Sequence, residues 1–408
     1  MSVYMTKGGV LLFSNIKAVF QRFELNWIFI FTTMTMMLPF PIACIGILLA
    51  TCYLLYKKSF INLIKHSYIH KLIWLFFLLS STVSALAQNL IGFFVTISLV
   101  VFYIYFTYYT TLIDKKTFQK ILDIMLHFSI VHAIYAWLEA YHILPPIDYH
   151  AMSKHFITWN DGRADSFFFN PNYYALACGF FILIAGYKMY HAKCLKKQGW
   201  YAFIAFLNGC GLLFTLTRTI LPSLLISLIT FGFLVESKIF RRFIIVAFIL
   251  SIISVIIFYS NVPRFELNLI DEHIDIRTSI WQASIEEFCH KPFGQGPLTY
   301  MTIYEKYASY PTQHAHNMIL DTLLNYGFLG ASLLIALFTK LLIQLHRIKN
   351  TGLLKSLRAL CMSFITLVLV SGLLDVTIFW VQTLFIFMTV CLSTTNLLKE
   401  KQNTSPSS

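Results

Sequence analysis

The segment Tyr310–Gly330, which reads YPTQHAHNMILDTLLNYGFLG, decides the fold, because within it a polar stretch becomes an apolar helix. His316 and Asn317 stand at the expected first turn, and Gly327 follows His316 by eleven residues. Eleven residues make about three helical turns, so we expect His316 and Gly327 on one face, with Gly330 near it. A face of small residues lets another helix approach closely inside lipid. The pattern places an imidazole at a helix N-terminus, where backbone N–H groups and the helix dipole favour anions such as phosphates.

The composition is typical of an integral membrane protein. Hydrophobic residues make up 58% of the 408 residues and charged residues 12%. Many apolar runs reach the roughly 20 residues that a helix needs to cross a bilayer. The first run, Trp27–Tyr56, begins too late and is too long for a cleaved signal peptide, so we expect it to be retained. The predicted fold class is an all-α polytopic membrane protein, with residues 1–398 as a single membrane domain and residues 399–408 as a disordered cytoplasmic tail.

The charge and the cysteines argue against other classes of protein. The net charge is +13, but the basic residues cluster in short segments between apolar runs, a pattern that reports membrane topology rather than nucleic-acid binding. Of the eight cysteines only Cys289 lies in the long outer segment proposed below, so no disulfide framework is indicated. No nucleic-acid partner and no cofactor are expected.

The apolar pattern predicts about twelve transmembrane helices. The run Trp27–Tyr56 is expected to form two of them, broken at Pro39 and Pro41, because proline interrupts a helix. The others are expected at about 71–88, 90–112, 118–140, 172–190, 200–216, 219–235, up to Ser260, from His316, 357–374 and 377–397.

The lysine-rich loops orient these helices. With about twelve spans and both termini inside, every short lysine-rich loop falls on the cytoplasmic side, as the positive-inside rule requires. The two long polar segments, about 141–170 and 261–315, then lie on the outer face. The second of them, partly helical, joins helices nine and ten and carries several motif residues.

The arginines of the outer side are the first candidates for binding an anion. Arg218 stands in Leu216–Thr219 between two apolar helices, and a charge at membrane depth is costly and usually has a partner or a ligand. The structural alternative is that Arg218 reaches the lipid headgroups or pairs with Glu139 or Asp375. Arg277 lies on a short amphipathic segment of the outer loop, where a lone arginine is usually a solvated charge.

A third arginine, Arg163, precedes the turn Phe167–Asn172, which leads into the next helix. Asn170 and Asn172 are candidate ligand-binding residues, and the alternative is that one of them simply caps that helix.

His316 also has structural alternatives. A histidine near a helix start is usually a cap or a satisfied polar group. His314 lies two residues earlier, and a pair of histidines spaced in this way can bind a metal, but the sequence shows no convincing third ligand and no metal site is predicted. The helix dipole disfavours protonation of an imidazole at a helix N-terminus, which suits a general base. Asp321, about one turn further on, is expected to orient this base through His316 or Asn317, or else to pack helices.

Four motifs together resemble the bacterial O-antigen ligase and polymerase superfamily. His316–Gly330 resembles its H-[N/S/Q]-x9-G-x-x-[G/T/Y] signature. Arg277–Trp281 followed by Lys291–Gly296 resembles its R-x-x-x-W and P-x-G-x-G loop. Leu216–Thr219 is similar to its intramembrane serine-arginine motif, with threonine in the serine position, and Arg163–Asn172 is similar to its arginine-to-N-P-N element. The resemblance covers about residues 160–335 by motif.

The resemblance implies an inverting, metal-independent glycosyltransferase of the GT-C type in the bacterial cytoplasmic membrane. Its donor would be a glycan on undecaprenyl pyrophosphate and its acceptor a glycan or glycolipid, with a flippase and a chain-length regulator as further partners. Arg218 and Arg277 would clamp the pyrophosphate, and His316 would be the base. The remaining expected residues are Arg163, Asn170, Asn172, Asn317 and Tyr300 for substrate binding, and Asp321, Gly327 and Gly330 in support.

Several alternatives stay open. Ligase and polymerase share this architecture, so the sequence does not separate them. A transporter or flippase of lipid-linked glycans also carries intramembrane arginines, but such proteins usually show internal repeats and broken central helices, and no clear repeat is present here. A non-catalytic scaffold in a glycan-assembly complex is the third hypothesis, and it predicts that replacing His316 has no effect.

Overall fold

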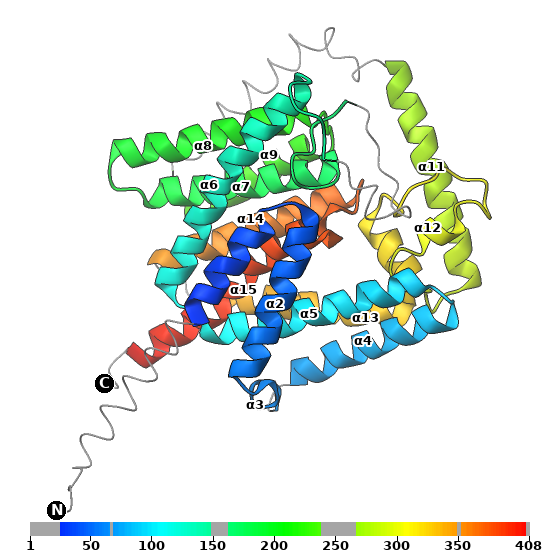
Figure 1. The fold of residues 1–408 in the computed structure, drawn as a ribbon, viewed down its shortest axis with the longest axis horizontal. Helices are drawn as coiled ribbons and strands as arrows, with labels where there is room; N and C mark the ends of the chain where they lie inside the picture. The colour runs from blue at the N-terminus through cyan, green and yellow to red at the C-terminus, as the bar shows by residue number, and fades with distance from the viewer. Residues whose placement is uncertain (1–24, 66–67, 148–161, 238–266, 349–351, 405–408) are drawn as a thin grey trace, which may run out of the picture.

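The computed structural model describes residues 25–65, 68–147, 162–237, 267–348 and 352–404, and within these ranges every regular element is a helix (Figure 1). Seven of the described helices are long and apolar enough to cross a membrane. Shorter apolar helices add to them: Leu25–Met36, Ile220–Val235 and Val381–Thr394. The chain is therefore an all-helical, polytopic membrane protein, as its composition predicts.

The first part of the chain forms the helix Leu25–Met36, α2 (Phe40–Lys57), α3 (Phe60–Ile64), α4 (Tyr68–Leu86), α5 (Leu90–Leu112) and α6 (Lys115–Ala140). The expected break at the prolines is confirmed, because Pro39 precedes α2 and Pro41 occupies its first turn, where a missing N–H costs nothing. Asn89 and Asp114 cap α5 and α6 by accepting backbone N–H groups with their side chains.

The second part forms α7 (Pro171–His191), α8 (Leu195–Phe214), α9 (Ile220–Val235), α11 (Leu267–His290), α12 (Tyr300–Ile303), α13 (Met318–His346), α14 (Gly352–Gly372), the 3-10 helix η2 (Thr377–Phe379) and α15 (Val381–Thr404). The helix expected to end near Ser260 lies outside the described residues. The predicted boundary at residue 398 falls inside α15, so this helix continues into the segment expected to be a tail.

The most buried helix of the bundle is α7, whose side chains from Tyr173 to Tyr187 are almost all enclosed. It packs against α8, α14 and α6, and the rings of Phe180 and Phe364 stack at 4.3 Å between α7 and α14. Dispersion contacts between such large side chains hold helices together where no hydrophobic driving force from water acts. Helices α11 and α12 lie at one end of this bundle, and the C-terminal end of α15 lies at the other (Figure 1).

The structure corrects the prediction for the start of α13. The helix begins at Met318, Asn317 is its N-cap, and His316 precedes it with a left-handed φ of 46°. Gly327 has φ 63° and ψ −175°, which interrupts the helix. His316 and Gly327 therefore do not share a helical face, because one lies before the helix and the other breaks it.

Candidate active site

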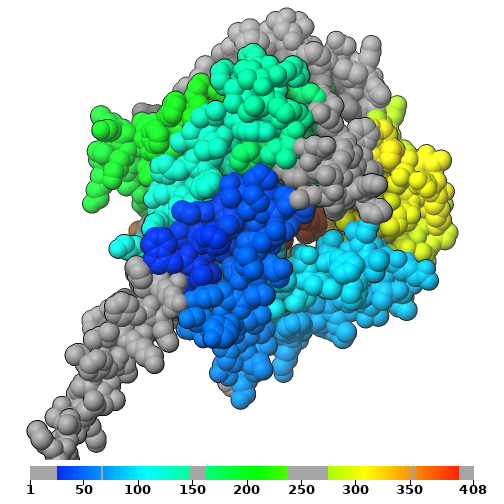
Figure 2. Space-filling view, in the orientation of Figure 1, coloured from blue at the N-terminus to red at the C-terminus, as the bar shows by residue number. Residues whose placement is uncertain are grey.

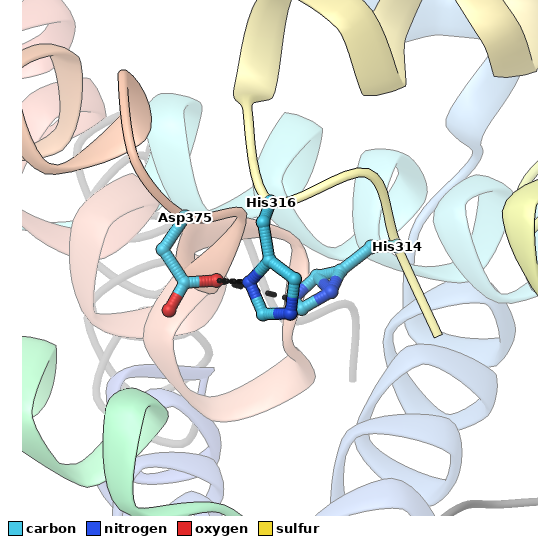
Figure 3. A group of neighbouring side chains, drawn as sticks. All are labelled: His314, His316 and Asp375. Atoms are coloured by element: carbon cyan, nitrogen blue, oxygen red, sulfur yellow. Dashed lines mark hydrogen bonds and ion pairs between the residues drawn. The ribbon is translucent and has the colours of Figure 1, made fainter. Parts of the chain in front are cut away.

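Asp375 forms the centre of a buried polar cluster (Figure 3). Nδ1 of His316 lies 3.1 Å from Asp375 Oδ1, and Nε2 of His314 lies 3.3 Å from the same oxygen. The histidines come from the loop that leads into α13, and Asp375 comes from the segment between α14 and η2. The two imidazole rings are 4.6 Å apart. Sequence reasoning named Asp321 as the partner of His316, and the structure shows Asp375 in that position.

The Asp375 carboxylate is held by two further hydrogen bonds. Its Oδ2 accepts from Asn172 Nδ2 at 2.6 Å, and its Oδ1 accepts from the backbone N–H of Val376 at 2.8 Å. Burial by itself would raise the pKa of Asp375, but the hydrogen bond from His316, the nearby imidazoles and the Val376 N–H outweigh burial and hold this pKa well below its usual value. The site therefore contains a fixed, ionised carboxylate beside His316.

His314 is the more enclosed of the two histidines, with 9% of its surface exposed. Burial of the imidazole makes the largest contribution to lowering the pKa of His314, to about 3, and the neighbouring His316 makes the next largest. His314 is therefore a neutral imidazole at physiological pH.

Asn172 connects Asp375 to two of the sequence motifs. Its Oδ1 accepts from Arg163 Nη1 at 3.2 Å and from Thr217 Oγ1 at 3.1 Å, while its Nδ2 donates to Asp375. Thr217 directly precedes Arg218 in the turn between α8 and α9. The structure thus brings together the Arg163–Asn172 element, the Leu216–Thr219 turn and the histidine loop.

The two other asparagines cap helices, and their expected role in substrate binding stays a prediction. Asn170 is the N-cap of α7, and its side chain accepts the N–H of Asn172. Asn317 caps α13 by accepting the N–H groups of Ile319 and Leu320, and its Nδ2 donates to the carbonyl of Leu373. This last bond ties the histidine loop to the segment that carries Asp375.

Tyr300 is fully buried, and its expected role in substrate binding stays a prediction. Its hydroxyl contacts Ser309 Oγ at 2.9 Å and the carbonyl of Tyr310 at 3.0 Å. Its ring belongs to a small core with Ile280 and Leu324, in which α11, α12 and α13 meet. Tyr300 therefore stabilises the outer segment beside the site.

Asp321 supports the site through the backbone rather than through an imidazole. Its Oδ1 accepts from the N–H of Ala315 at 3.0 Å, and its Oδ2 accepts from Asn325 Nδ2 at 2.7 Å. Ala315 is the residue between the two histidines. The buried Asp321 side chain therefore fixes the backbone from which both imidazoles project.

The loop Pro292–Pro297 is inserted at the interruption of α13. The carbonyl of Asn325 accepts from the N–H groups of Gln295 and Gly296, and Phe328 N–H donates to the Pro292 carbonyl at 3.0 Å. Asn89 of α5 donates to the carbonyls of Gln295 and Pro297 at 3.1 and 2.9 Å. Asn325 also contacts Asp321, so the loop, the helix break and the histidine loop form one continuous hydrogen-bonded unit.

The glycines of α13 serve two different contacts. A Cβ on Gly327 would lie 2.2 Å from the carbonyl carbon of Phe293, so this glycine admits the loop backbone rather than a second helix. A Cβ on Gly330 would lie 3.3 Å from the side chain of Leu79 in α4, so only Gly330 fits the expected helix contact.

Arg218 and Arg277 are both half-buried. Arg218 lies in the turn between α8 and α9, one residue after Thr217, and Arg277 lies on α11, which packs against α13. That both guanidinium groups face one ligand stays a prediction.

The backbone carries strain in the motif segments. Non-glycine residues with left-handed φ occur there at His316 and at three others: Ser166, Phe169 and Leu216. Such conformations cost about 1–3 kcal/mol each and persist where surrounding contacts impose them, which is common at functional sites.

A network around Glu287 holds the outer segment together. The buried carboxylate of Glu287 accepts from Lys306 Nζ, Tyr307 hydroxyl and Gln295 Nε2 at 2.5–2.8 Å. Burial would raise the pKa of Glu287, but these hydrogen bonds outweigh it and lower the pKa to about 2.

The Glu287 network predicts a pH-dependent contribution to stability. Because the folded-state pKa lies below the ordinary value of 4.5, the ionised group stabilises the fold above pH 4.5, and this contribution is lost as the pH falls toward 2. Glu287→Gln should therefore lower the Tm at pH 7, and the difference from the wild type should shrink in acid. Glu286→Gln, at the exposed neighbouring position, is the control. A Tm difference that is equal at pH 7 and pH 3 would contradict the assignment.

These features define a polytopic membrane protein with an imidazole–carboxylate cluster at one end of its helical bundle. Residues 203–335 match the family model described as O-antigen ligase. This part of the chain is therefore similar to the O-antigen ligase family, which agrees with the resemblance of its motifs. The match includes Arg218, Arg277 and His316 and ends before Asp375. No curated protein matched the chain.

Proposed function

We propose that this protein transfers or polymerises undecaprenyl-pyrophosphate-linked oligosaccharide repeats on the outer face of the bacterial cytoplasmic membrane. The observation that carries the proposal is the 3.1 Å contact between His316 Nδ1 and the buried Asp375 carboxylate, in a cluster that also holds Arg163 and the Thr217–Arg218 turn. The similarity to the O-antigen ligase family supports transfer of a lipid-linked glycan.

The contact with Asp375 selects the form of His316 that can act as a base. A carboxylate accepts a hydrogen bond, so the proton of the neutral imidazole resides on Nδ1 and the lone pair on Nε2. Nε2 lies 3.3 Å from Thr312 Oγ1, and the His316 side chain is 21% exposed. It would take the proton of an acceptor hydroxyl as that oxygen attacks the anomeric carbon of the donor. The bond from this carbon to the pyrophosphate breaks, and the carbon inverts.

The arginines match the charge of the leaving group. A pyrophosphate gains negative charge as it departs, and guanidinium groups neutralise phosphate oxygens through paired hydrogen bonds. Arg218 and Arg277 are assigned this role, and Arg163 holds Asn172 against Asp375. No step in this scheme is routed through a metal ion.

A hollow in the molecular surface lies near the end of α14. Figure 2 shows a hollow between α2, the α4–α5 pair and the yellow outer segment, with atoms in its depth coloured as the chain around the end of α14. Asp375 lies three residues after α14 ends. A polyprenyl chain in the bilayer would reach the site through this hollow.

The orientation follows from the lysines. We propose about twelve spans, with both termini in the cytoplasm. Basic residues stand at the helix ends remote from the site, for example Lys57, Lys115 and Lys196, and the positive-inside rule places these ends in the cytoplasm.

The test is glycan transfer by the purified protein in detergent, with defined lipid-linked repeats as substrate. Arg218→Ala and Arg277→Ala should each lower the rate by about 10²–10³-fold, the usual effect of removing one group that stabilises developing charge. Arg347→Ala, at the opposite end of α13, should leave the rate unchanged.

The alternatives predict different outcomes of the same assay. If the protein is a transporter, the assay shows no glycan transfer, because detergent solution has no separate compartments. If it is a scaffold, neither the wild type nor any variant transfers glycan. Mass analysis of the product separates polymerase from ligase, because a polymerase joins repeats to one another and a ligase joins a glycan to a different acceptor.

A further inference from the structure

The His314, His316 and Asp375 cluster has the spacing of a metal site. The three donor atoms lie within 4.8 Å of one another, and the two contacts to Asp375 Oδ1 measure 3.1 and 3.3 Å. In a tetrahedral zinc site with bonds of about 2.0–2.2 Å, neighbouring donor atoms are about 3.3–3.6 Å apart. An ion could therefore enter with small side-chain movements.

His314 supplies a second, independent observation. It is 9% exposed, and within the described part of the chain neither of its ring nitrogens has a hydrogen-bond partner. Leaving a buried polar group without a partner costs free energy, and each such group in a native protein calls for an explanation, an ion being one. Nε2 of His314 points toward Asp375, so a metal at this position would satisfy it (Figure 3).

The remaining polar atoms of Asp375 and His316 are already held as those of metal ligands usually are. Asp375 Oδ2 accepts from Asn172, and His316 Nε2 lies 3.3 Å from Thr312 Oγ1. Such outer contacts orient metal ligands and select the imidazole tautomer.

We propose that His314, His316 and Asp375 bind a divalent transition-metal ion of the zinc class. Two imidazoles and one carboxylate suit such an ion better than Mg²⁺ or Ca²⁺, which prefer oxygen ligands. Three protein ligands leave a fourth position for water, and the His316 side chain is 21% exposed.

The ion would switch the proposed enzyme off, a consequence that rests on the proposed function. A metal on Nδ1 of a neutral His316 moves the ring proton to Nε2, and the base then has no lone pair for the acceptor hydroxyl. Metal binding and proton abstraction by His316 are therefore mutually exclusive, and zinc is an inhibitor rather than a cofactor of this site.

The experiment measures zinc binding and transfer on the same full-length protein in detergent. After treatment with a chelator, Zn²⁺ is titrated by calorimetry, and bound zinc is counted by mass spectrometry after desalting. The wild type should hold one zinc ion per chain, and His314→Gln should weaken binding at least tenfold. His290→Gln removes a histidine from the exposed end of α11 and is the matched control, and Mg²⁺ replaces Zn²⁺ as the ion control.

Transfer rates of each variant are compared with and without zinc. Zinc should inhibit the wild type, and the half-inhibiting concentration should rise at least tenfold in His314→Gln, measured against that variant's own rate. Equal zinc binding by wild type and His314→Gln would overturn the site, and activation by zinc would overturn the inhibition. Zinc binding that depends on His314, with no transfer under any condition, would refute the proposed function and leave the metal site standing.

Discussion

Replacing Asp375 with asparagine should lower the rate of glycan transfer by about 10³–10⁴-fold, the effect expected when the residue that sets the tautomer of a catalytic histidine is exchanged for an amide. An asparagine at position 375 can donate its own N–H to Nδ1 of His316, which moves the ring proton to Nε2. The variant keeps the shape of the site and loses the base, so transfer should fall while the Tm changes little. Single-turnover transfer of a defined lipid-linked repeat, normalised to folded protein, measures the effect.

A double-substitution experiment tests whether Asp375 acts through His316. His316→Ala should reduce transfer at least as far as Asp375→Asn, and the double variant should be no slower than His316→Ala alone, because groups that act as one unit are strongly non-additive. Asp114→Asn is the matched control, since asparagine caps a helix as well as aspartate and this residue caps α6. A rate for Asp375→Asn within tenfold of the wild type would remove Asp375 from the mechanism.

The helices were predictable because they depend on local sequence. Apolar runs of sufficient length, the proline break before α2 and the asparagine before Met318 all act over a few residues, and each appears near its predicted position. The motifs also contain Arg163, Asn172 and Thr217, and the hydrogen bonds that join these three side chains became visible only in the structure.

The partner of His316 could not be obtained from the motifs, because Asp375 is 59 residues away in the sequence and outside all of them. One feature of the sequence did point to Asp375 as a functional residue. Asp375 is the only charged residue between Arg358 and Lys399, and a lone carboxylate in an apolar stretch is a functional candidate by default. Asp321 was the nearer candidate, but its carboxylate is occupied by Ala315 N–H and Asn325.

The break in α13 was also invisible to pattern reasoning. A glycine spaced eleven residues from His316 fits helical periodicity, and sequence alone does not reveal the sign of φ at Gly327 or the loop that packs against it. The role of Asn170 could not be read from the sequence either, because a helix cap and a ligand-binding asparagine have the same sequence signature.

Gly327→Ala should destabilise the outer segment by about 3 kcal/mol or more, because it adds backbone strain to steric overlap. At φ 63° and ψ −175° the backbone occupies a region that is open almost only to glycine. The added Cβ would also lie 2.2–2.5 Å from the backbone of Phe293, which cannot move without releasing the loop from Asn325. Transfer should fall by at least about 10²-fold, since small displacements of positioning groups have effects of that size.

Gly352→Ala is the control that separates the effect of backbone strain from the effect of steric overlap. Gly352 also has a left-handed φ of 57°, but nothing lies within 4 Å of its added Cβ, so this variant should lose only the roughly 1–2 kcal/mol of the unfavourable backbone conformation. Thermal melts and limited proteolysis between α11 and α13 report the stability of each variant. If the two alanine variants melted alike and both transferred glycan at the wild-type rate, the insertion of the Pro292–Pro297 loop into α13 would not position the histidines. If only Gly327→Ala fails, the break in α13 is the element that couples the outer segment to His316, through Asn325, Asp321 and the backbone of Ala315.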